Sequence, residues 1–256
     1  MRADHVLNSE ALQPLLEQLV AQLQSLPEPL EDYHSQENEP VYQSGDRVRL
    51  ITGFSGSGKT SWVDELGTHT ASPLLYFDVA GMPSAGVPAA LAREMAAFVL
   101  AEDSPERQQI LLPGVSGVQS LRVIDLFISV HVQDMTIVLD NGHRISDDIL
   151  VETVRSMASA KWIVLAQEWP GHQLFSTTTE AGVLTLSGWS RDTIAREATA
   201  SGCFGTIENF QSLHDLTGGL PLFVRDALRI CKESYNGDAA RYVPSRSVSG
   251  KAVIAS

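Results

Sequence analysis

Gly53-Phe54-Ser55-Gly56-Ser57-Gly58-Lys59-Thr60 follows a short apolar run at residues 48–52 and precedes a segment with helical character. The stretch matches the pattern G-x-x-x-x-G-K-[ST], in which a glycine-rich loop joins a buried strand to a helix. Glycines allow the tight path that points successive backbone N–H groups into the loop, at the positive end of the following helix. A glycine-rich turn can match by chance, but the flanking strand and helix favour a P-loop, which binds the phosphates of a nucleoside triphosphate.

The positions of this loop have expected roles. The side chain of Lys59 would reach the β- and γ-phosphates, and the hydroxyl of Thr60 would hold Mg²⁺. The expected nucleotide-binding residues of the loop are Gly53, Phe54, Ser55, Gly56, Ser57, Gly58, Lys59, Thr60 and Ser61.

A second metal-orienting carboxylate is expected at the end of a neighbouring buried strand. Asp140 fits this role, because an apolar run at residues 136–139 leads directly into it and Asn141-Gly142 then ends the strand. An aspartate that only begins a turn is the alternative, which the upstream P-loop disfavours. The sequence therefore predicts that Thr60 and Asp140 hold the metal, and that Lys59 and Asp140 belong to the catalytic set.

Apolar runs alternate with helical segments along most of the chain. They predict strands at residues 48–52, 74–78, 136–140, 162–166 and 183–186, and helices at residues 60–66, 88–102, 120–132 and 147–160. After Ser190 only helices are expected, at residues 191–199, 207–216 and 221–234. Apolar strands separated by helices are typical of a mainly parallel sheet covered on both faces. We therefore expect the α/β fold of a P-loop NTPase, a three-layer sandwich, followed by a small helical subdomain.

The two ends of the chain differ from this core. Leucines at three- and four-residue spacings predict an amphipathic helix at residues 9–26, which either packs on its own domain or binds a partner. Residues 27–45 are acidic and contain prolines, so we expect a linker or an ordered strap. The expected domains are residues 1–45 (helix and acidic linker), 46–189 (P-loop α/β core), 190–234 (helical subdomain) and 235–256 (a disordered tail or the stub of a further domain).

Composition argues against several classes of protein. The chain of 256 residues has a formal net charge of −13, so nucleic-acid binding is not indicated. It has no apolar stretch long enough to span a membrane, and its acidic N-terminus is unlike a signal peptide. The two cysteines, Cys203 and Cys231, lack a metal-like or redox-like spacing. We therefore expect buried, reduced thiols in a cytoplasmic protein.

Three segments together resemble one family. The P-loop, the run Ile137-Val138-Leu139-Asp140-Asn141-Gly142-His143, and Gly218-Gly219-Leu220-Pro221-Leu222 are similar to segments of the AAA+-related signal-transduction ATPases called the STAND class. The resemblance covers about residues 48–234 and implies ATP and Mg²⁺ as cofactors. It also implies that Pro221 lies against the adenine, although Gly-Gly-Leu-Pro is by itself an ordinary loop-to-helix junction. A protein partner or self-association is implied by the resemblance alone.

Several positions depart from the pattern of actively hydrolysing AAA+ ATPases. Those enzymes follow the strand-end aspartate with a glutamate that activates water, whereas this chain has Asn141, which cannot accept a proton. After the strand at 162–166, Gln167 could orient water and Glu168 could act as the base, or both could cap the strand end. Leu222 stands about where relatives carry a sensor arginine, and no arginine finger can be assigned.

The leading hypothesis is a regulatory switch that binds ATP with Mg²⁺, hydrolyses it slowly and moves its helical subdomain with nucleotide state. Two alternatives remain. Asn141 favours a hydrolysis-deficient module that uses bound nucleotide to hold a partner. A small-molecule P-loop kinase has less support, because we find no arginine-rich lid between the strands.

Overall fold

The computed structural model describes residues 33–100, 104–112, 114–132 and 134–247. The helix expected at residues 9–26 therefore lies outside the described residues. Contacts divide the described chain into two compact units. The sheet unit comprises Val41–Thr52 and Val63–Leu184, and the helical unit comprises residues 33–40, Gly53–Trp62 and residues 185–247. The P-loop is thus grouped with the helical unit, whereas the sequence predicted one continuous domain over residues 46–189.

A five-stranded sheet forms the centre of the α/β part, as the sequence predicted. Its strands are β1 (Val48–Thr52), β2 (Leu74–Asp78), β3 (Thr136–Asp140), β4 (Lys161–Ala166) and β5 (Gly182–Thr185). Their order is β2-β3-β4-β1-β5, and the neighbouring strands from β2 to β1 pair in parallel. The carboxyl ends of these strands therefore lie at one edge of the sheet, the edge at which β1 ends and the P-loop begins.

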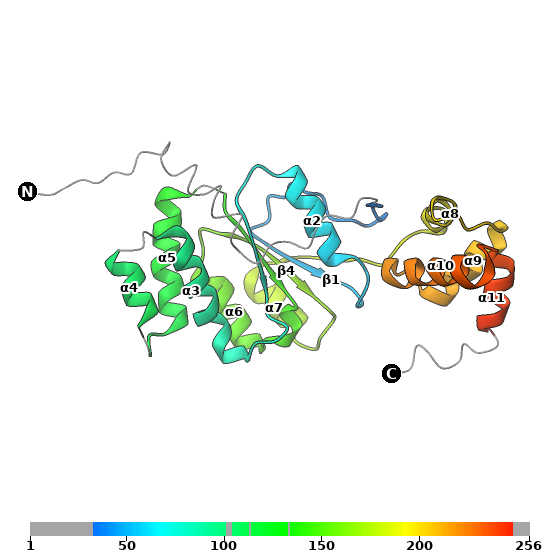
Figure 1. Cartoon of the computed structure of the whole chain (residues 1–256). Coiled ribbons are helices and arrows are strands. Elements are labelled where there is room, and N and C mark those ends of the chain that lie inside the picture. Colours follow the sequence, from blue (N-terminus) through cyan, green and yellow to red (C-terminus); the bar gives the residue numbers. More distant parts are fainter. Residues whose placement is uncertain (1–32, 101–103, 113, 133, 248–256) are drawn as a thin grey trace, which may run out of the picture. The chain divides into compact units, whose positions relative to one another are not determined.

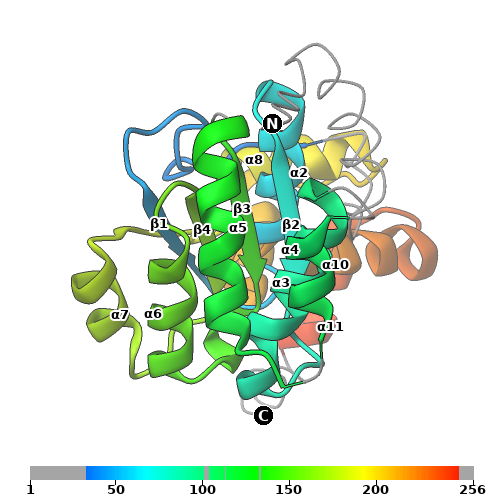
Figure 2. The ribbon, with the colours of Figure 1, turned by 90° about the vertical axis from the view of Figure 1, so that its left-hand side faces the viewer.

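The alternation of side chains along the strands sorts them onto the two faces of the sheet. Helices α3 (Val87–Val99), α5 (Gly117–His131) and α6 (Asp147–Ser156) gather on one face, as Figure 2 shows. There they form one core with alternate strand residues, among them Phe77, Leu139 and Val164. The residues between these, such as Tyr76 and Val138, are buried on the opposite face. Asp140 shares that second face with Val138, which is paired in register with Tyr76.

The remaining elements outside the helical bundle are three helices and two 3-10 turns among the described residues. They are α2 (Lys59–His69), the 3-10 turns η1 (Ser84–Gly86) and η2 (Gly142–Arg144), α4 (Pro105–Leu111) and α7 (His172–Thr179). Figure 1 labels α2, α4 and α7. The sequence did not predict α4 or α7, which have only seven and eight residues. Segments of this length contain too few turns to establish a helical repeat of apolar residues.

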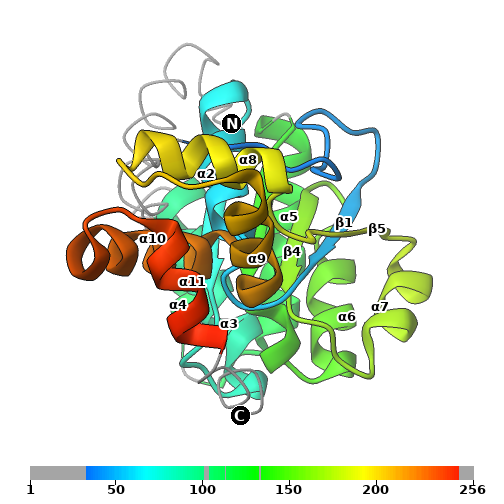
Figure 3. The ribbon, with the colours of Figure 1, turned by 90° about the vertical axis from the view of Figure 1, so that its right-hand side faces the viewer.

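The helical unit contains α8 (Arg191–Ala200), α9 (Ile207–Thr217), α10 (Pro221–Tyr235) and α11 (Ala239–Ser247), which Figure 3 shows gathered together. The Ser190 hydroxyl accepts a hydrogen bond from the Thr193 N–H and so caps α8, while Thr206 and Asn209 form a capping box on α9. Buried residues from all four helices form a second core, among them Ile194, Phe210, Leu228 and Tyr242. The sequence predicted the first three helices to within a residue or two.

The fourth helix corrects the expectation for the C-terminal segment. From residue 235 the sequence predicted a disordered tail or the stub of a further domain. Residues 239–247 instead form α11, and Ala239, Tyr242 and Val243 are buried in the helical core. The prediction of disorder is therefore wrong for these residues. Helix α11 packs on α9 and α10, and such packing provides most of the stability of a short helix.

Two compositional expectations can be compared with the fold. Cys203 and Cys231 are buried free thiols in the helical core, as expected. Among the described residues, no helix combines the length and the apolar character needed to cross a membrane.

Candidate nucleotide-binding site

The loop between β1 and α2 takes a path that depends on its glycines. Gly56 and Gly58 have φ angles of 80° and 92°, in the left-handed region that residues with a Cβ rarely adopt. Between them, the N–H of Ser57 donates to the carbonyl of Phe54 at 3.1 Å. The N–H of Trp62 then donates to the carbonyl of Gly58 at 2.9 Å, which continues the first turn of α2. The loop therefore opens directly into a helix N-terminus, as phosphate binding requires.

Lys59 lies across this loop. Its Nζ donates to the carbonyl of Gly53 at 2.8 Å and to that of Phe54 at 3.0 Å, so the ammonium group is held beside the residues that begin the loop. Thr60 and Ser61 follow in the first turn of α2, where both are half-buried, while Phe54 and Ser55 are exposed. The residues predicted at positions 53–61 thus form one continuous structure with the donors that a phosphate needs.

Ser57 gives a direct indication that a polar group belongs in the loop. The residue is fully buried, and its hydroxyl is one of two buried side-chain groups in the described residues without a hydrogen-bond partner. The other is Oδ1 of Asp64. A buried hydroxyl without a partner is costly in free energy, which a ligand that accepts its hydrogen would relieve.

The segment Gly218-Gly219-Leu220-Pro221-Leu222 packs on the loop within the helical unit. The N–H of Leu222 donates to the carbonyl of Gly56 at 3.3 Å. A Cβ at Gly56 would lie 2.8 Å from Cβ of Leu222, and one at Gly58 would lie 3.7 Å from Cγ of Pro221. The structure therefore places Pro221 beside the loop, and the close approach of Leu222 leaves no room for a side chain at residue 56.

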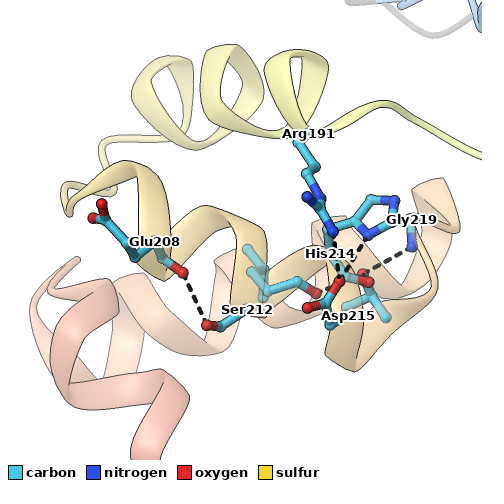
Figure 4. A network of polar contacts seen from close by, with 8 residues as sticks. Arg191, Glu208, Ser212, His214, Asp215 and Gly219 are labelled. Atoms are coloured by element: carbon cyan, nitrogen blue, oxygen red, sulfur yellow. Dashed lines mark hydrogen bonds and ion pairs between the residues drawn. The ribbon is translucent and has the colours of Figure 1, made fainter.

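A network of polar contacts holds this segment in place. The carbonyl of Gly219 accepts from the N–H of Trp189 at 2.7 Å, which joins the start of α10 to the segment before α8. Figure 4 shows the end of α9, where Asp215 contacts both Arg191 (3.4 Å) and His214 (3.3 Å). The N–H of Gly219 also donates to the carbonyl of His214 at 3.2 Å. These contacts fix the turn that presents Pro221 and Leu222.

Asp140 ends β3 in the sheet unit and is buried. Its Oδ2 accepts from the hydroxyl of Tyr76 at 2.7 Å, and its Oδ1 accepts from the N–H of Asn141 at 2.6 Å. A carboxylate is a ligand of the type that a hard cation such as Mg²⁺ prefers. The two bonds fix the direction of the carboxylate.

Asn141 links β3 to β2. Its φ angle is 61°, a left-handed conformation that asparagine tolerates better than most residues. Its Nδ2 donates to Oδ1 of Asp78 at 2.8 Å, and the N–H of Ala80 donates to the same oxygen at 2.9 Å. Directly after the strand-end aspartate, this chain thus has a side chain that links the ends of two strands.

Burial and negative charge shift two pKa values beside Asp140. Asp64 on α2 is buried, and burial together with the charge of Asp140 raises its pKa to about 7. Burial, followed by its hydrogen bond to Asp140, raises the pKa of Tyr76 above its ordinary value, so the hydroxyl keeps its proton and acts as the donor. A cation near Asp140 would lower both values.

Gln167 and Glu168 follow β4, the strand next to β3, and both are exposed. The N–H of Gln167 donates to Nδ1 of His143 at 3.2 Å. His143 therefore caps the end of β4 and connects it to the turn after Asp140. The structure places Asp140, Gln167 and Glu168 at the same edge of the sheet, and it leaves the two roles considered for Gln167 and Glu168 open.

The donor set fits a P-loop magnesium site in kind. Among the described residues, no group of three or more His, Cys, Asp or Glu side chains could hold a metal by itself. Magnesium in P-loop proteins does not need such a group, because it binds one hydroxyl, phosphate oxygens and waters, with a carboxylate orienting them. Thr60 and Asp140 are residues of the required types.

Four residues of the site region were not found from the sequence. They are Gln36, Asp64, Tyr76 and Asp78. Tyr76 and Asp78 stand in a predicted strand that ends at the same edge as β3, a signal that could have indicated them. Gln36 and Asp64 belong to no motif, and only the fold reveals their contacts.

Solved structures share the fold of this chain. The chain has the fold of the P-loop ATPases of the AAA+ and STAND type, as the sequence predicted. It is similar to a STAND protein with a tetratricopeptide repeat sensor from Pyrococcus horikoshii, with a TM-score of 0.56 and 18% identity. That likeness covers 81% of this chain and 31% of the other, so this chain spans about a third of the length of that protein.

Two origin-recognition proteins from Aeropyrum pernix are also similar. The ORC1 protein, solved in complex with DNA, has a TM-score of 0.51 at 14% identity, and the likeness covers 93% of this chain and 64% of that one. The ORC2 protein, solved in ADPNP and ADP complexes, has a TM-score of 0.50 at 12% identity, with 95% and 67% covered. No protein-family model and no curated protein match this sequence. Structural likeness at identities this low shows the fold alone.

Proposed function

We propose that this chain binds ATP with Mg²⁺ and acts as a regulatory switch that hydrolyses the nucleotide slowly. The observation that carries the proposal is the loop at residues 53–60, with left-handed glycines, a lysine across it and a helix N-terminus at its end. This combination of donors suits a triphosphate and few other ligands. The free thiols support a reducing compartment, so a cytoplasmic location is part of the proposal.

Each site residue has a role in this proposal. Lys59 would neutralise charge on the β- and γ-phosphates, Thr60 would hold Mg²⁺, and Asp140 would be the second residue that orients the metal. Bound Mg²⁺ would supply charge neutralisation between the two phosphates. Gln167 and Glu168 are the candidates for orienting or deprotonating a water, and Pro221 is the candidate for contact with the adenine.

The switch part of the proposal rests on how α10 begins. Leu222 packs on Gly56, so a change in the loop's conformation on phosphate binding would displace the first turn of α10. A ligand shifts a conformational equilibrium only through contacts that differ between the two states. The direct packing of α10 on the phosphate loop is a suitable source of such a difference.

Binding is tested by calorimetry with Lys59→Ala and, as a matched control, Lys232→Ala, which removes an exposed lysine of α10. We expect the Lys59 variant to lose ATP binding, because an ammonium–phosphate contact is lost, and the Lys232 variant to bind like the wild type. ATP affinity that does not change in the Lys59→Ala protein would rule out the proposed site. Measurements with ATP, ADP and GTP, followed by mass determination in each state, would identify the nucleotide and any linked self-association.

A second candidate function is a hydrolysis-deficient module that holds nucleotide for binding a partner. Asn141 favours it, because its side chain is engaged with Asp78 and cannot act as a base. Phosphate release separates the two functions, with Asp140→Ala as the control. Turnover above that control supports the slow ATPase, whereas equal turnover supports the binding module. A phosphorylated acceptor in place of free phosphate would indicate the kinase alternative.

A further inference from the structure

Gln36 contacts the phosphate loop from a segment that precedes β1. Its side chain is buried, and its carboxamide makes two hydrogen bonds within the helical unit. Nε2 donates to the carbonyl of Ser57 at 2.6 Å, and Oε1 accepts from the N–H of Gly188 at 2.8 Å. One carboxamide therefore joins the middle of the P-loop to the segment that leads into α8. The assignment of its nitrogen and oxygen is unambiguous, because one partner is an acceptor and the other a donor.

The bond to Ser57 determines the direction of the Gly58 N–H in the P-loop. The peptide unit between Ser57 and Gly58 is planar and trans, so its carbonyl and the N–H of Gly58 point in opposite directions. When Gln36 holds the carbonyl on its own side, the N–H of Gly58 is directed away from Gln36. A Cβ at Gly58 would lie only 3.2 Å from Nε2 of Gln36, so the carboxamide is packed against this peptide unit.

Gln36 is itself held by the segment of residues 33–40, which we call the strap. The N–H of Gln36 donates to Oε2 of Glu39 at 3.1 Å, and the hydroxyl of Tyr33 donates to Oε1 of the same residue. Two tryptophans then fasten the strap. The indole N–H of Trp62 on α2 donates to the carbonyl of Pro40 at 3.2 Å, and that of Trp189 donates to the carbonyl of His34 at 3.1 Å.

The strap also contacts two helices of the bundle. Nε2 of His34 lies 2.7 Å from Oε2 of Glu197 on α8, and Oε1 of Glu197 accepts from Nε of Arg225 on α10 at 3.1 Å. The guanidinium of Arg225 lies 5.3 Å from the ring centre of Trp189. The strap is therefore fixed at both ends to the same unit that contains the loop, and the Gln36 carboxamide is not free to turn.

We propose that Gln36 is a positioning residue for triphosphate recognition. It sets the orientation of the Ser57–Gly58 peptide unit and couples that peptide unit to Gly188, so that phosphate binding and the position of the segment before α8 depend on each other. The inference rests on the proposed ATP site and identifies a residue that regulates it. Gln36 does not touch the nucleotide, and its effect passes through the backbone of the loop.

The test compares Gln36→Met, which keeps the length of the side chain and removes both hydrogen bonds, with Glu37→Gln, which changes an exposed neighbour on the strap. Displacement of a fluorescent ATP analogue by Mg-ATP and by adenosine gives the two affinities. We expect Gln36→Met to weaken Mg-ATP binding by about ten-fold, because only the lost bond to Ser57 acts directly on the loop. Adenosine, which has no phosphate, should bind as it does to the wild type, and Glu37→Gln should change neither affinity.

Gln36→Glu is the second variant. It keeps an acceptor for the Gly188 N–H but cannot donate to Ser57, so it removes one of the two hydrogen bonds and keeps the other. It replaces Gln36→Met as the test variant if Gln36→Met lowers the melting temperature. The ¹⁵N–¹H shift of Gly58 should move in both variants. Equal losses for ATP and adenosine would assign Gln36 a merely structural role, and unchanged ATP affinity in both variants would also overturn the inference. If the wild type binds no ATP, the proposed function fails instead.

Discussion

Asp140 is surrounded by side chains that restrict what it can do. Tyr76 and the N–H of Asn141 hold its two oxygens, and Asp64 is a second buried carboxyl close enough to feel its charge. Burial, together with the negative charge of Asp140, raises the pKa of Asp64 to about 7. Asp64 therefore keeps its proton at pH values below about 7.

Asp64→Asn tests this assignment through the dependence of stability on pH. Because the pKa of Asp64 is raised to about 7 in the folded state, the folded protein binds the proton more tightly than the unfolded chain. The contribution of protonated Asp64 to the free energy of unfolding is full below about pH 4. It is lost as the pH rises from there to about 7. Above pH 7 the wild type carries a buried charge that the variant lacks.

We expect the melting temperature of Asp64→Asn, measured in EDTA, to exceed that of the wild type at pH 8 by about 2–4 °C. The difference should shrink or reverse at pH 5. Glu65→Gln, which changes the next residue of α2, is the control. A difference that does not depend on pH would contradict the raised pKa.

Asn141 and Asp78 form a pair that can be exchanged. Asn141→Asp removes the donor and places two carboxylates together, so we expect a loss of about 1–3 kcal/mol in the free energy of unfolding. Asp78→Asn in the same protein supplies a donor from the other side and should restore most of that loss. Denaturant unfolding of the single and double variants gives the coupling. Strictly additive losses would show that the two side chains do not interact.

At the scale of elements, the loop and α10 act as one structure. The first turn of α10 packs so closely on Gly56 that no side chain fits there, and the left-handed φ angle independently disfavours one. The position of α10 depends in turn on the contacts at the end of α9 (Figure 4) and on the hydrogen bond from Trp189 to Gly219. The phosphate loop is thus supported from outside its own strand and helix.

Gly56→Ala is the corresponding prediction. The new Cβ would lie 2.8 Å from Cβ of Leu222, and the backbone conformation would cost about 1–2 kcal/mol more. We expect loss of ATP binding by calorimetry, with a smaller loss of thermal stability. Gly81→Ala, where a Cβ meets no atom within 4 Å and φ is not left-handed, is the matched control. Normal ATP affinity in the Gly56 variant would mean that the loop does not need this path.

Helix α11 makes a second prediction at this scale. Tyr242 is 6% exposed in the helical core, whereas the side chain of Arg241 is 74% exposed. Tyr242→Ala should therefore destabilise the protein by about 3 kcal/mol, as large-to-small core substitutions do, and Arg241→Ala should have little effect. If both variants changed the melting temperature negligibly, residues 239–247 would not be packed in the core, which would support the disordered tail predicted from the sequence.

At the scale of the whole molecule, two cores are built from interleaved parts of one chain. The sheet unit and the helical unit exchange segments along the sequence, and α2 begins in the helical unit at Lys59 and continues in the sheet unit from Val63. Helix α2 therefore contributes residues to both units.

Mg-ATP should raise the melting temperature of the whole chain as one transition. A ligand at 100 times its dissociation constant adds about 2.7 kcal/mol, which corresponds to a shift of about 5–10 °C for a protein of this size. Differential scanning calorimetry with and without nucleotide measures it, and Lys59→Ala should show no shift. A shift confined to one of two separate transitions would show that nucleotide stabilises one unit alone.

The sequence by itself determined the class of fold and the phosphate loop. Both depend on local properties. These are the left-handed conformations of Gly56 and Gly58, apolar runs that form buried strands, and a lysine at a helix N-terminus. These signals lie within a few residues of each other, so the order of residue types is enough to predict them. The five strands and the main helices followed from the same kind of signal.

Only the tertiary structure decided which residues support the site. Gln36 and Gly188 are 152 residues apart, and Tyr76 and Asp140 are 64 apart, yet each pair shares a hydrogen bond. No periodicity or motif links such positions, because their proximity depends on how strands and helices pack. Helix α11 was missed for the same reason, because its buried residues pack on α9 and α10, which are distant contacts that no local pattern indicates. The loop can be predicted from the order of residues in the sequence, but the contacts that orient it form only in the folded protein.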